Sequence, residues 1–172
     1  EASGDFLYRL EPYRKVHEAE APVPPPPPRI VGDRSLWKAQ ARLNPHLADL
    51  AVDGDLKTAW STGYPQSAED FFTVDLGRTE RFSRLEMRLE RNPLDFPRSF
   101  AVDISGDGRT WTEVERDDAY FPDLSADMVE DFSRYVVPAI FPEAEARFVR
   151  VRLTGGHAYR HWSIAEFVLR GE

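Results

Sequence analysis

The chain has 172 residues, of which 41% are hydrophobic and 30% charged; this is enough apolar material for one folded domain and excludes a wholly disordered chain. The formal net charge of −8 disfavours general binding to nucleic acid or to anionic membranes, because both require a basic excess. Cysteine is absent, which excludes disulfide scaffolds, thiolate zinc sites and cysteine nucleophiles. No apolar run approaches the roughly 20 residues that a membrane-spanning helix needs.

Residues 1–28 are expected to form an arm outside the compact domain. The prolines between Pro22 and Pro28 predict a stiff polyproline II segment, and an apolar, aromatic stretch from Phe6 to Tyr13 precedes it. We interpret this arm as a spacer that joins the domain, residues 29–172, to the rest of a longer protein. A ligand for an SH3 or WW domain is the alternative interpretation.

From Arg29 onward, apolar and polar residues alternate with period two, which is typical of antiparallel strands with one buried face. Asp107-Gly108 predicts a hairpin, since both residues tolerate positive φ. Only Ser125–Phe132 reads as a short helix, with Ser125 as its N-cap. The pattern therefore predicts an all-β sandwich. The expected strands lie within residues 72–76, 85–89, 100–104, 110–114, 135–137, 149–153 and 164–169.

Three segments carry a resemblance to a known family. They are Ala51–Ser61 (AVDGDLKTAWS), Ser99–Trp111 (SFAVDISGDGRTW) and Arg147–Leu153 (RFVRVRL), the last leading to Trp162–Phe167 (WSIAEF). Their order resembles the discoidin family, that is, the coagulation factor V/VIII type C domains, and especially the bacterial family 32 carbohydrate-binding modules. The resemblance covers roughly residues 33–170. It implies an antiparallel eight-stranded jelly-roll sandwich, of the galactose-binding-domain type, with ligand loops at one end.

The same resemblance implies a buried structural Ca²⁺ ion. The matching ligands are Asp53, Asp55, Thr58 and Glu166, completed by backbone carbonyls near residues 50 and 51. Calcium takes six to eight oxygen ligands in irregular geometry, which suits this set. A Glu on an apolar strand also needs a partner, because a buried unpaired carboxylate is costly. The alternative is a surface Asp-Gly-Asp turn and a Glu at the margin of a sheet.

An EF-hand is excluded as the calcium template. Counting Asp49 as the first position places Ala51 at the third and Trp60 at the twelfth, where the loop requires carboxylates.

Three loops are expected to converge at one end of the resembled fold, residues 61–66, 91–98 and 155–161. They offer aromatic faces for stacking on a pyranose and polar groups for its hydroxyls. A solvated loop end without a ligand is the alternative. The candidate stacking residues are Tyr64, Phe96 and Tyr159, and the candidate hydrogen-bonding residues are Asn92, Asp95, Arg98 and His157.

The tryptophans Trp60 and Trp111 are expected in the core, whereas Trp162 is ambiguous between core and site. His157 and His161 have a spacing that would suit zinc on a helix, but Gly155-Gly156 before them indicates a loop. The carboxylates between residues 113 and 131 are expected on a solvated surface. No nucleophile elbow, P-loop or dinucleotide fingerprint occurs in the sequence.

We therefore expect a non-catalytic carbohydrate-binding module of a larger bacterial protein outside the cytoplasm, whether periplasmic, secreted or at the cell surface. Its partners would be a glycan or polysaccharide and other domains of the same protein; nucleic acid is not expected, and membrane association only through the parent protein. The first alternative is a structural or protein-interaction domain that binds no sugar. A phospholipid-binding domain would use Leu94 and Phe96 beside Arg91 and Arg98, and the net charge opposes it.

Overall fold

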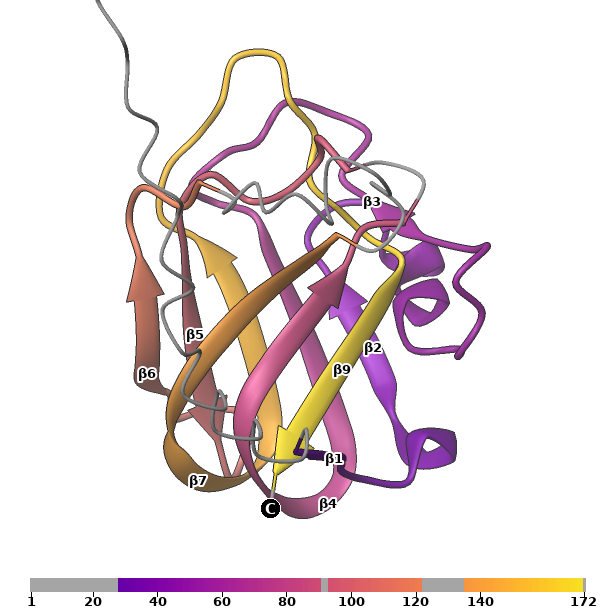
Figure 1. The fold of residues 1–172 in the computed structure, drawn as a ribbon, viewed down its shortest axis with the longest axis vertical. Helices are drawn as coiled ribbons and strands as arrows, with labels where there is room; N and C mark the ends of the chain where they lie inside the picture. Colours follow the sequence, from indigo (N-terminus) through magenta and orange to yellow (C-terminus); the bar gives the residue numbers. More distant parts are fainter. Residues whose placement is uncertain (1–27, 91–92, 122–134, 172) are drawn as a thin grey trace, which may run out of the picture.

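Antiparallel strands make up most of the computed structural model, which describes residues 28–90, 93–121 and 135–171 (Figure 1). The main sheet has the order β1-β9-β4-β7-β5-β6, with β2 paired to β4, and a second sheet pairs β3 with β8. The predicted antiparallel sandwich is therefore confirmed. The strands are β1 (Arg29–Ile30), β2 (Lys38–Ala41), β3 (Trp60–Ser61), β4 (Phe71–Arg88), β5 (Phe100–Ser105), β6 (Thr112–Asp117), β7 (Val136–Leu153), β8 (Ser163–Ile164) and β9 (Glu166–Gly171).

Two strands of 18 residues, β4 and β7, connect the layers of the sandwich. Both curve at the lower end of Figure 1, so that their two halves lie in front and back layers. The curve in β4 coincides with a register shift between Asp75 and Glu80, where Gly77 has a φ of 77°. The Asp75 side chain accepts a hydrogen bond from the Gly77 N–H at 2.8 Å and stabilises the bend. The sequence runs 72–76 and 85–89 are thus mostly parts of one strand, and β7 likewise joins the runs near 137 and 149.

The helices of the described residues are two short 3₁₀ segments, η1 (Arg34–Leu36) and η2 (Pro45–Ala51). The sequence pattern did not predict η2, since a seven-residue segment shows too few turns for a helical period. Ala48 and Ala51, three residues apart, face the core from it. The helix predicted over Ser125–Phe132 lies outside the described residues. None of the helices in the described part has the length and apolar character that crossing a bilayer requires.

A cluster of aromatic rings joins the two sheets. Trp60 on β3 lies 4.9 Å from Phe72 on β4 and 5.1 Å from Trp162, measured between ring centroids. Phe72 lies 5.9 Å from Phe167 on β9. All four rings are fully buried. Offset and edge-to-face ring pairs stabilise a fold by more than the burial of their area alone. This cluster therefore holds the small sheet against the large one.

The predicted hairpin at Asp107-Gly108 connects β5 to β6. Gly108 has a φ of 71°, and the Asp107 carboxylate accepts hydrogen bonds of 2.8 Å from the backbone N–H groups of Arg109 and Thr110. These backbone hydrogen bonds lower the pKa of Asp107. The turn is therefore specified locally by its own residues.

The ends of the described domain lie side by side. Arg29 of β1 pairs with Gly171 of β9, and Ile30 pairs with Arg170. The proline-rich arm lies outside the described residues, so the domain boundary at residue 29 stays a prediction. All the strands on which the site depends belong to the described part.

Candidate functional site

Three loops meet at the upper end of the sandwich in Figure 1, and the side chain of Gln66 connects them. Its Nε2 donates to the carbonyls of Phe96 at 2.9 Å and His161 at 2.7 Å, and its Oε1 accepts from the N–H of Arg98 at 3.1 Å. Its backbone carbonyl accepts from the N–H of His157 at 3.0 Å. Gln66 is 5% exposed. One buried amide thus brings the three predicted loops together, a role that no pattern in the sequence indicated.

Thr62 and Gly156 complete the junction of the loops. The N–H of Thr62 donates to the carbonyl of Trp162 at 2.8 Å, and the N–H of Trp162 donates to the Thr62 hydroxyl at 3.1 Å. That hydroxyl donates in turn to the carbonyl of Tyr64 at 2.7 Å. At Gly156 a Cβ atom would lie 2.9 Å from the Gln66 carbonyl oxygen, so only glycine allows this approach. The loop bases are therefore held by hydrogen bonds, with the loop tips in solvent.

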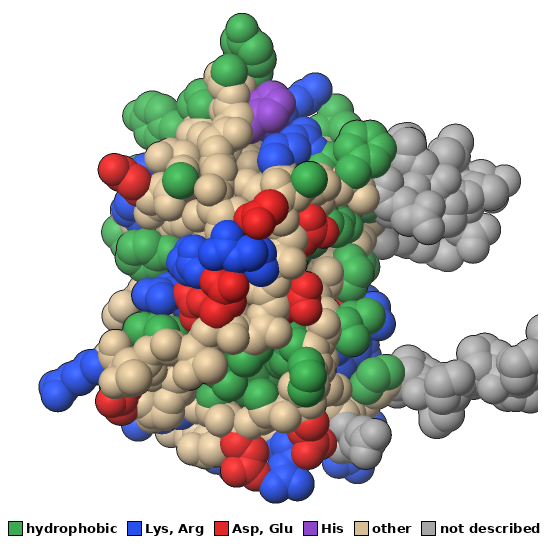
Figure 2. Space-filling model, turned by 90° about the vertical axis from the view of Figure 1, so that its left-hand side faces the viewer, with side chains coloured by type: hydrophobic (Ala, Val, Ile, Leu, Met, Phe, Trp, Pro, Cys, Tyr) green, Lys and Arg blue, Asp and Glu red, His purple; other side chains and the backbone are tan. Residues whose placement is uncertain are grey.

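The tips of the loops carry two exposed tyrosines. Tyr159 is 86% exposed and Tyr64 is 65% exposed. Figure 2 shows hydrophobic side chains gathered at this upper end, with a histidine and basic side chains next to them. Large exposed aromatic rings on a fixed loop base are suited to bind a partly apolar ligand.

His157 lies beside Tyr159, with the ring centroids 6.4 Å apart and the rings nearly perpendicular. Its Nδ1 accepts from the N–H groups of Tyr159 at 3.2 Å and Arg160 at 3.0 Å. An accepting Nδ1 leaves the ring proton on Nε2, from which it can donate to a ligand oxygen. His157 and His161 do not belong to a metal site: among the described residues, no group of three or more His, Cys, Asp or Glu side chains is placed to hold a metal.

Phe96 does not present a stacking face to solvent. It is 4% exposed, and its ring packs against those of Tyr120 and Tyr135, each 5.8 Å away. The guanidinium of Arg98 lies 3.4 Å from the Phe96 ring centroid and donates to the carbonyl of Leu94 at 3.0 Å. The predicted stacking role of Phe96 is thus replaced by a supporting one, because the ring holds Arg98 in place.

Asp95 is half-buried at the same end. Burial raises the pKa of its carboxyl, and the positive charges of His161, Arg160 and Arg98 partly oppose this rise. Its backbone carbonyl accepts from Ser163 N–H at 3.0 Å, which ties its loop to β8. The remaining candidate, Asn92, lies outside the described residues.

The burial of the tryptophans differs in part from the prediction made from the sequence. Trp60 is buried as expected, and Trp162 is fully buried too, which assigns it to the core. Trp111 is only half-buried, and the guanidinium of Arg150 lies 4.2 Å from its ring centroid. The prediction of a core position for Trp111 is wrong, because a long Arg side chain and not the core covers this ring.

The predicted calcium ligands Asp53, Asp55 and Thr58 form one oxygen-rich turn. The Thr58 hydroxyl lies 2.8 Å from Asp53 Oδ2, 2.8 Å from the carbonyl of Asp55 and 3.4 Å from the carbonyl of Leu50. A hydroxyl has one proton and can donate to one of these oxygens at a time. Asp55 turns its carbonyl toward Thr58, whereas its carboxylate accepts from the N–H of Lys57 at 2.9 Å.

Glu166, the fourth predicted ligand, is a buried carboxylate at the start of β9. It is 3% exposed, and neither carboxylate oxygen accepts a hydrogen bond from the described residues. The Arg34 Nη2 atom forms an ion pair with Glu166 Oε1. Burial lowers the pKa of Arg34, and the charge of Asp53 opposes this. Arg34 therefore lies within the electrostatic reach of both Asp53 and Glu166.

The oxygen atoms of Asp53, Thr58 and Glu166, with backbone carbonyls, are of the types that calcium takes. Among the described residues, however, Asp53, Asp55 and Glu166 do not form a group of three carboxylates placed to hold a metal. The Arg34 guanidinium is a competing cation at the same carboxylates. Sequence patterns did not indicate this role of Arg34, because Arg34 precedes the turn by about twenty residues and only the fold brings it to Glu166.

Comparison with known proteins identifies the fold family. The model of the F5/8 type C domain matches residues 36–167. The chain belongs to the F5/8 type C domain family. No curated protein matches the sequence.

Solved structures share the fold of this F5/8 type C domain at low sequence identity. The module CpGH89CBM32-5 from Clostridium perfringens, in complex with GalNAc-β-1,3-galactose, is 19% identical with a TM-score of 0.62, covering 80% of this chain and 97% of its own. The family 32 module of C. perfringens NanJ, in complex with galactose, is 18% identical with a TM-score of 0.63, covering 80% and 96%. Truncated AlyQ, with family 32 and alginate lyase domains, is 20% identical with a TM-score of 0.58, covering 85% of this chain and 34% of its own.

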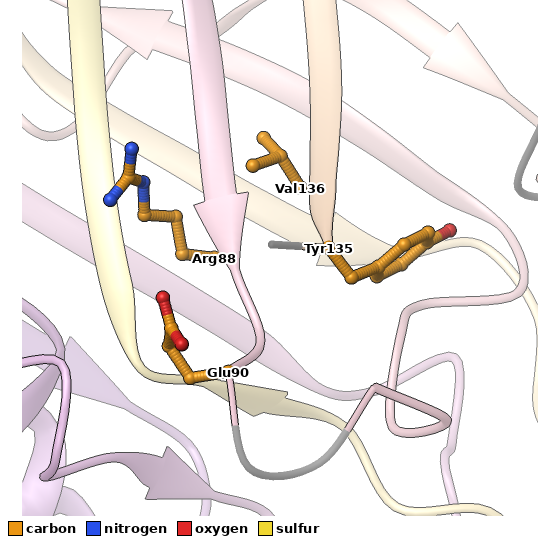
Figure 3. A pocket seen from close by; sticks show the side chains of 4 residues that line it. All are labelled: Arg88, Glu90, Tyr135 and Val136. Atoms are coloured by element: carbon orange, nitrogen blue, oxygen red, sulfur yellow. The ribbon is translucent and has the colours of Figure 1, made fainter. Parts of the chain in front are cut away.

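This F5/8 type C domain also has a small pocket of about 310 Å³ between the end of β4 and the start of β7 (Figure 3). Arg88, Glu90, Tyr135 and Val136 line it. Tyr135 is buried, and its hydroxyl donates to that of Tyr120 at 3.2 Å. The pocket therefore offers no open aromatic face, unlike the loop tips.

Proposed function

We propose that this domain is a non-catalytic module that binds carbohydrate at the loop end of the sandwich. The observation that carries the proposal is the pairing of the exposed Tyr159 ring with His157, whose Nε2 can donate to a hydroxyl. Tyr64, on the neighbouring loop, supplies a second exposed ring. A sugar presents an apolar C–H face and a rim of hydroxyls, which matches this combination.

The polar part of the proposed site comes from Arg98 and Asp95; Asn92 stays a prediction outside the described residues. Arg98 is pre-oriented by the Phe96 ring, so less conformational entropy is lost when a ligand accepts its remaining N–H groups. The similarity to modules solved with galactose and with GalNAc-β-1,3-galactose supports a sugar as the ligand.

A binding panel tests this function. The full chain is titrated with galactose, GalNAc-β-1,3-galactose, alginate oligosaccharides and a broad glycan array. We expect a hit that Tyr159→Ala weakens about tenfold or more, the size of effect that loss of an exposed aromatic anchor typically has. Ile140→Ala is the control, since Ile140 is equally an exposed apolar side chain but lies on strand β7. Silence across the panel would favour a protein-interaction domain instead.

We also propose a structural calcium ion at Asp53, Thr58, Glu166 and the carbonyl of Asp55. The acceptor-rich surroundings of the Thr58 hydroxyl and the buried carboxylate of Glu166 support this. The ion would connect segments that are far apart in sequence. Calcium titration of the chain is expected to give saturable binding that Glu166→Gln abolishes.

The proposed setting is a larger bacterial protein outside the cytoplasm, in which this module holds another domain near its polysaccharide. The bacterial relatives, and the presence of a similar module beside a lyase domain in AlyQ, support this setting. A fusion of this chain to a reporter enzyme would be retained by a matching polysaccharide, and the Tyr159→Ala fusion would not.

A further inference from the structure

The Arg34 guanidinium lies beside the carboxylates of Glu166 and Asp53, whose negative charges a bound calcium ion would otherwise neutralise. Its Nη2 forms an ion pair with Glu166 and donates to the carbonyl of Phe167 at 3.2 Å, so the guanidinium is fixed to the start of β9. The guanidinium carbon lies 5.4 Å from the centroid of the Trp37 ring. A side chain fixed in this way supplies one positive charge to a buried carboxylate.

The carboxylate needs that charge because nothing else in the described residues compensates it by hydrogen bonding. Arg34 Nη2 contacts Glu166 Oε1, whereas Glu166 Oε2 has no hydrogen-bond donor among the described residues. Arg88 stands opposite Glu166 in the register of β4 and β9, but the ion pair is made by Arg34. The Arg34 charge therefore compensates the carboxylate, while the lone pairs of Oε2 stay available for another cation.

An open depression beside Arg34 gives room for the side chain to move. It has a volume of about 490 Å³, and its lining includes Arg34, Trp37, Asp49 and Asp53. Arg34 extends from the three-residue η1, and its side chain is 27% exposed. The guanidinium can therefore turn from Glu166 into solvent without unfolding a long element.

We propose that Arg34 acts as a built-in cation of this domain: it occupies the place between Asp53 and Glu166 without calcium, and it must leave Glu166 when calcium binds. This inference rests on the calcium site proposed above. One consequence is that the metal-free domain stays folded. The other is that calcium binds only to the fraction of molecules in which Arg34 has left the site, so the apparent calcium affinity is lowered in proportion to that fraction.

The test compares the full chain with Arg34→Gln in calorimetric titrations with CaCl₂ after chelator treatment. We expect Arg34→Gln to bind calcium about tenfold or more tightly, since a competitor present nine-tenths of the time lowers the apparent affinity by that factor. Arg84→Gln is the matched control, because Arg84 pairs with the buried Glu86 at 2.8 Å. It is expected to leave calcium affinity unchanged.

Thermal unfolding in chelator gives a second readout. Arg34→Gln is expected to lower Tm, and either added calcium or the second substitution Glu166→Gln to restore it, because each removes the uncompensated charge. Equal calcium affinity of wild type and Arg34→Gln would overturn the inference and leave the calcium site intact. Absence of calcium binding in every variant would overturn the calcium site itself, and displacement with it.

Discussion

At the scale of single residues, the loop end depends on one buried amide. Gln66 uses both atoms of its side-chain amide and its backbone carbonyl to hold neighbouring loops, with contacts between 2.7 and 3.1 Å. A buried polar group of this kind is favourable only while all its partners are present, because each orphaned partner costs its desolvation energy. The positions of Arg98 and His157 therefore depend on a residue that need not touch the ligand.

Replacing Gln66 by Ala is expected to destabilise the domain and to weaken sugar binding together. Three side-chain hydrogen bonds are lost, at about 1 kcal/mol each, so the free energy of unfolding should fall by about 3 kcal/mol. Urea unfolding measures the first effect and titration with the identified sugar the second. Gln40→Ala, at an exposed position of β2, serves as the control and should change neither. If Gln66→Ala binds the sugar with wild-type affinity, sugar binding does not depend on the hydrogen bonds that Gln66 makes between the loops.

At the scale of elements, the pairing of β5 with β7 carries a buried charge cluster. Asp103 of β5 accepts from Arg150 at 2.7 Å and from Arg152 at 3.0 Å, both on β7. Arg152 also contacts Glu113 of β6, so the cluster extends over three adjacent strands. Asp103 is buried, whereas the two arginines are partly exposed. Glu113, from the acidic stretch predicted on a solvated surface, is exposed as expected, and Asp103 is the buried carboxylate of the cluster.

Loss of the Asp103 carboxylate should therefore be costly. Asp103→Ala is expected to lower the free energy of unfolding by about 2 kcal/mol, since it removes charge-assisted hydrogen bonds from Arg150 and Arg152, whose charges stay in contact with water. The exposed pair of Arg81 and Glu145 provides the comparison, and Glu145→Ala should cost less than about 1 kcal/mol. Equal losses in the two variants, measured by urea unfolding, would show that burial of Asp103 carries no extra cost.

At the scale of the whole molecule, the aromatic cluster connects the small β3–β8 sheet, which adjoins two of the three loops, to the large sheet. Trp60 and Trp162 belong to the small β3–β8 region, and Phe72 and Phe167 to the large sheet. The indole N–H of Trp60 donates to the carbonyl of Leu43 at 2.9 Å. Packing between the sheets therefore positions the loop end relative to the rest of the domain.

Truncating the centre of this cluster should affect the whole domain. Phe72→Ala is expected to cost about 3–5 kcal/mol, since it removes buried area and leaves a cavity between the sheets. Phe148→Ala, at a half-buried position of β7, should cost only about 1 kcal/mol. Differential scanning calorimetry would measure both. A single cooperative transition in Phe72→Ala would agree with one folded unit, and a loss as small as that of Phe148→Ala would contradict the role of the cluster.

Sequence patterns predicted the fold because strand alternation and turn chemistry are local. The period-two runs from Phe72 to Leu169 identified the strands, and Asp107-Gly108 identified a hairpin from two residues. The continuity of β4 and β7 through both layers could not be predicted in this way, since a bend at Gly77 looks like a turn between separate strands. The family follows from motif order, which is equally a property of the chain alone.

By itself, the sequence determined an antiparallel sandwich of the F5/8 type C family and the three loops with its candidate ligand residues. Only the tertiary structure decided which of these residues face solvent: it exposed Tyr64 and Tyr159, and it buried Phe96 against Tyr120 and Tyr135. Only the tertiary structure brought Arg34 to Glu166 across 132 positions (166 − 34). The physical reason is that burial and ion pairing depend on what packs against a residue, and those neighbours come from distant parts of the chain.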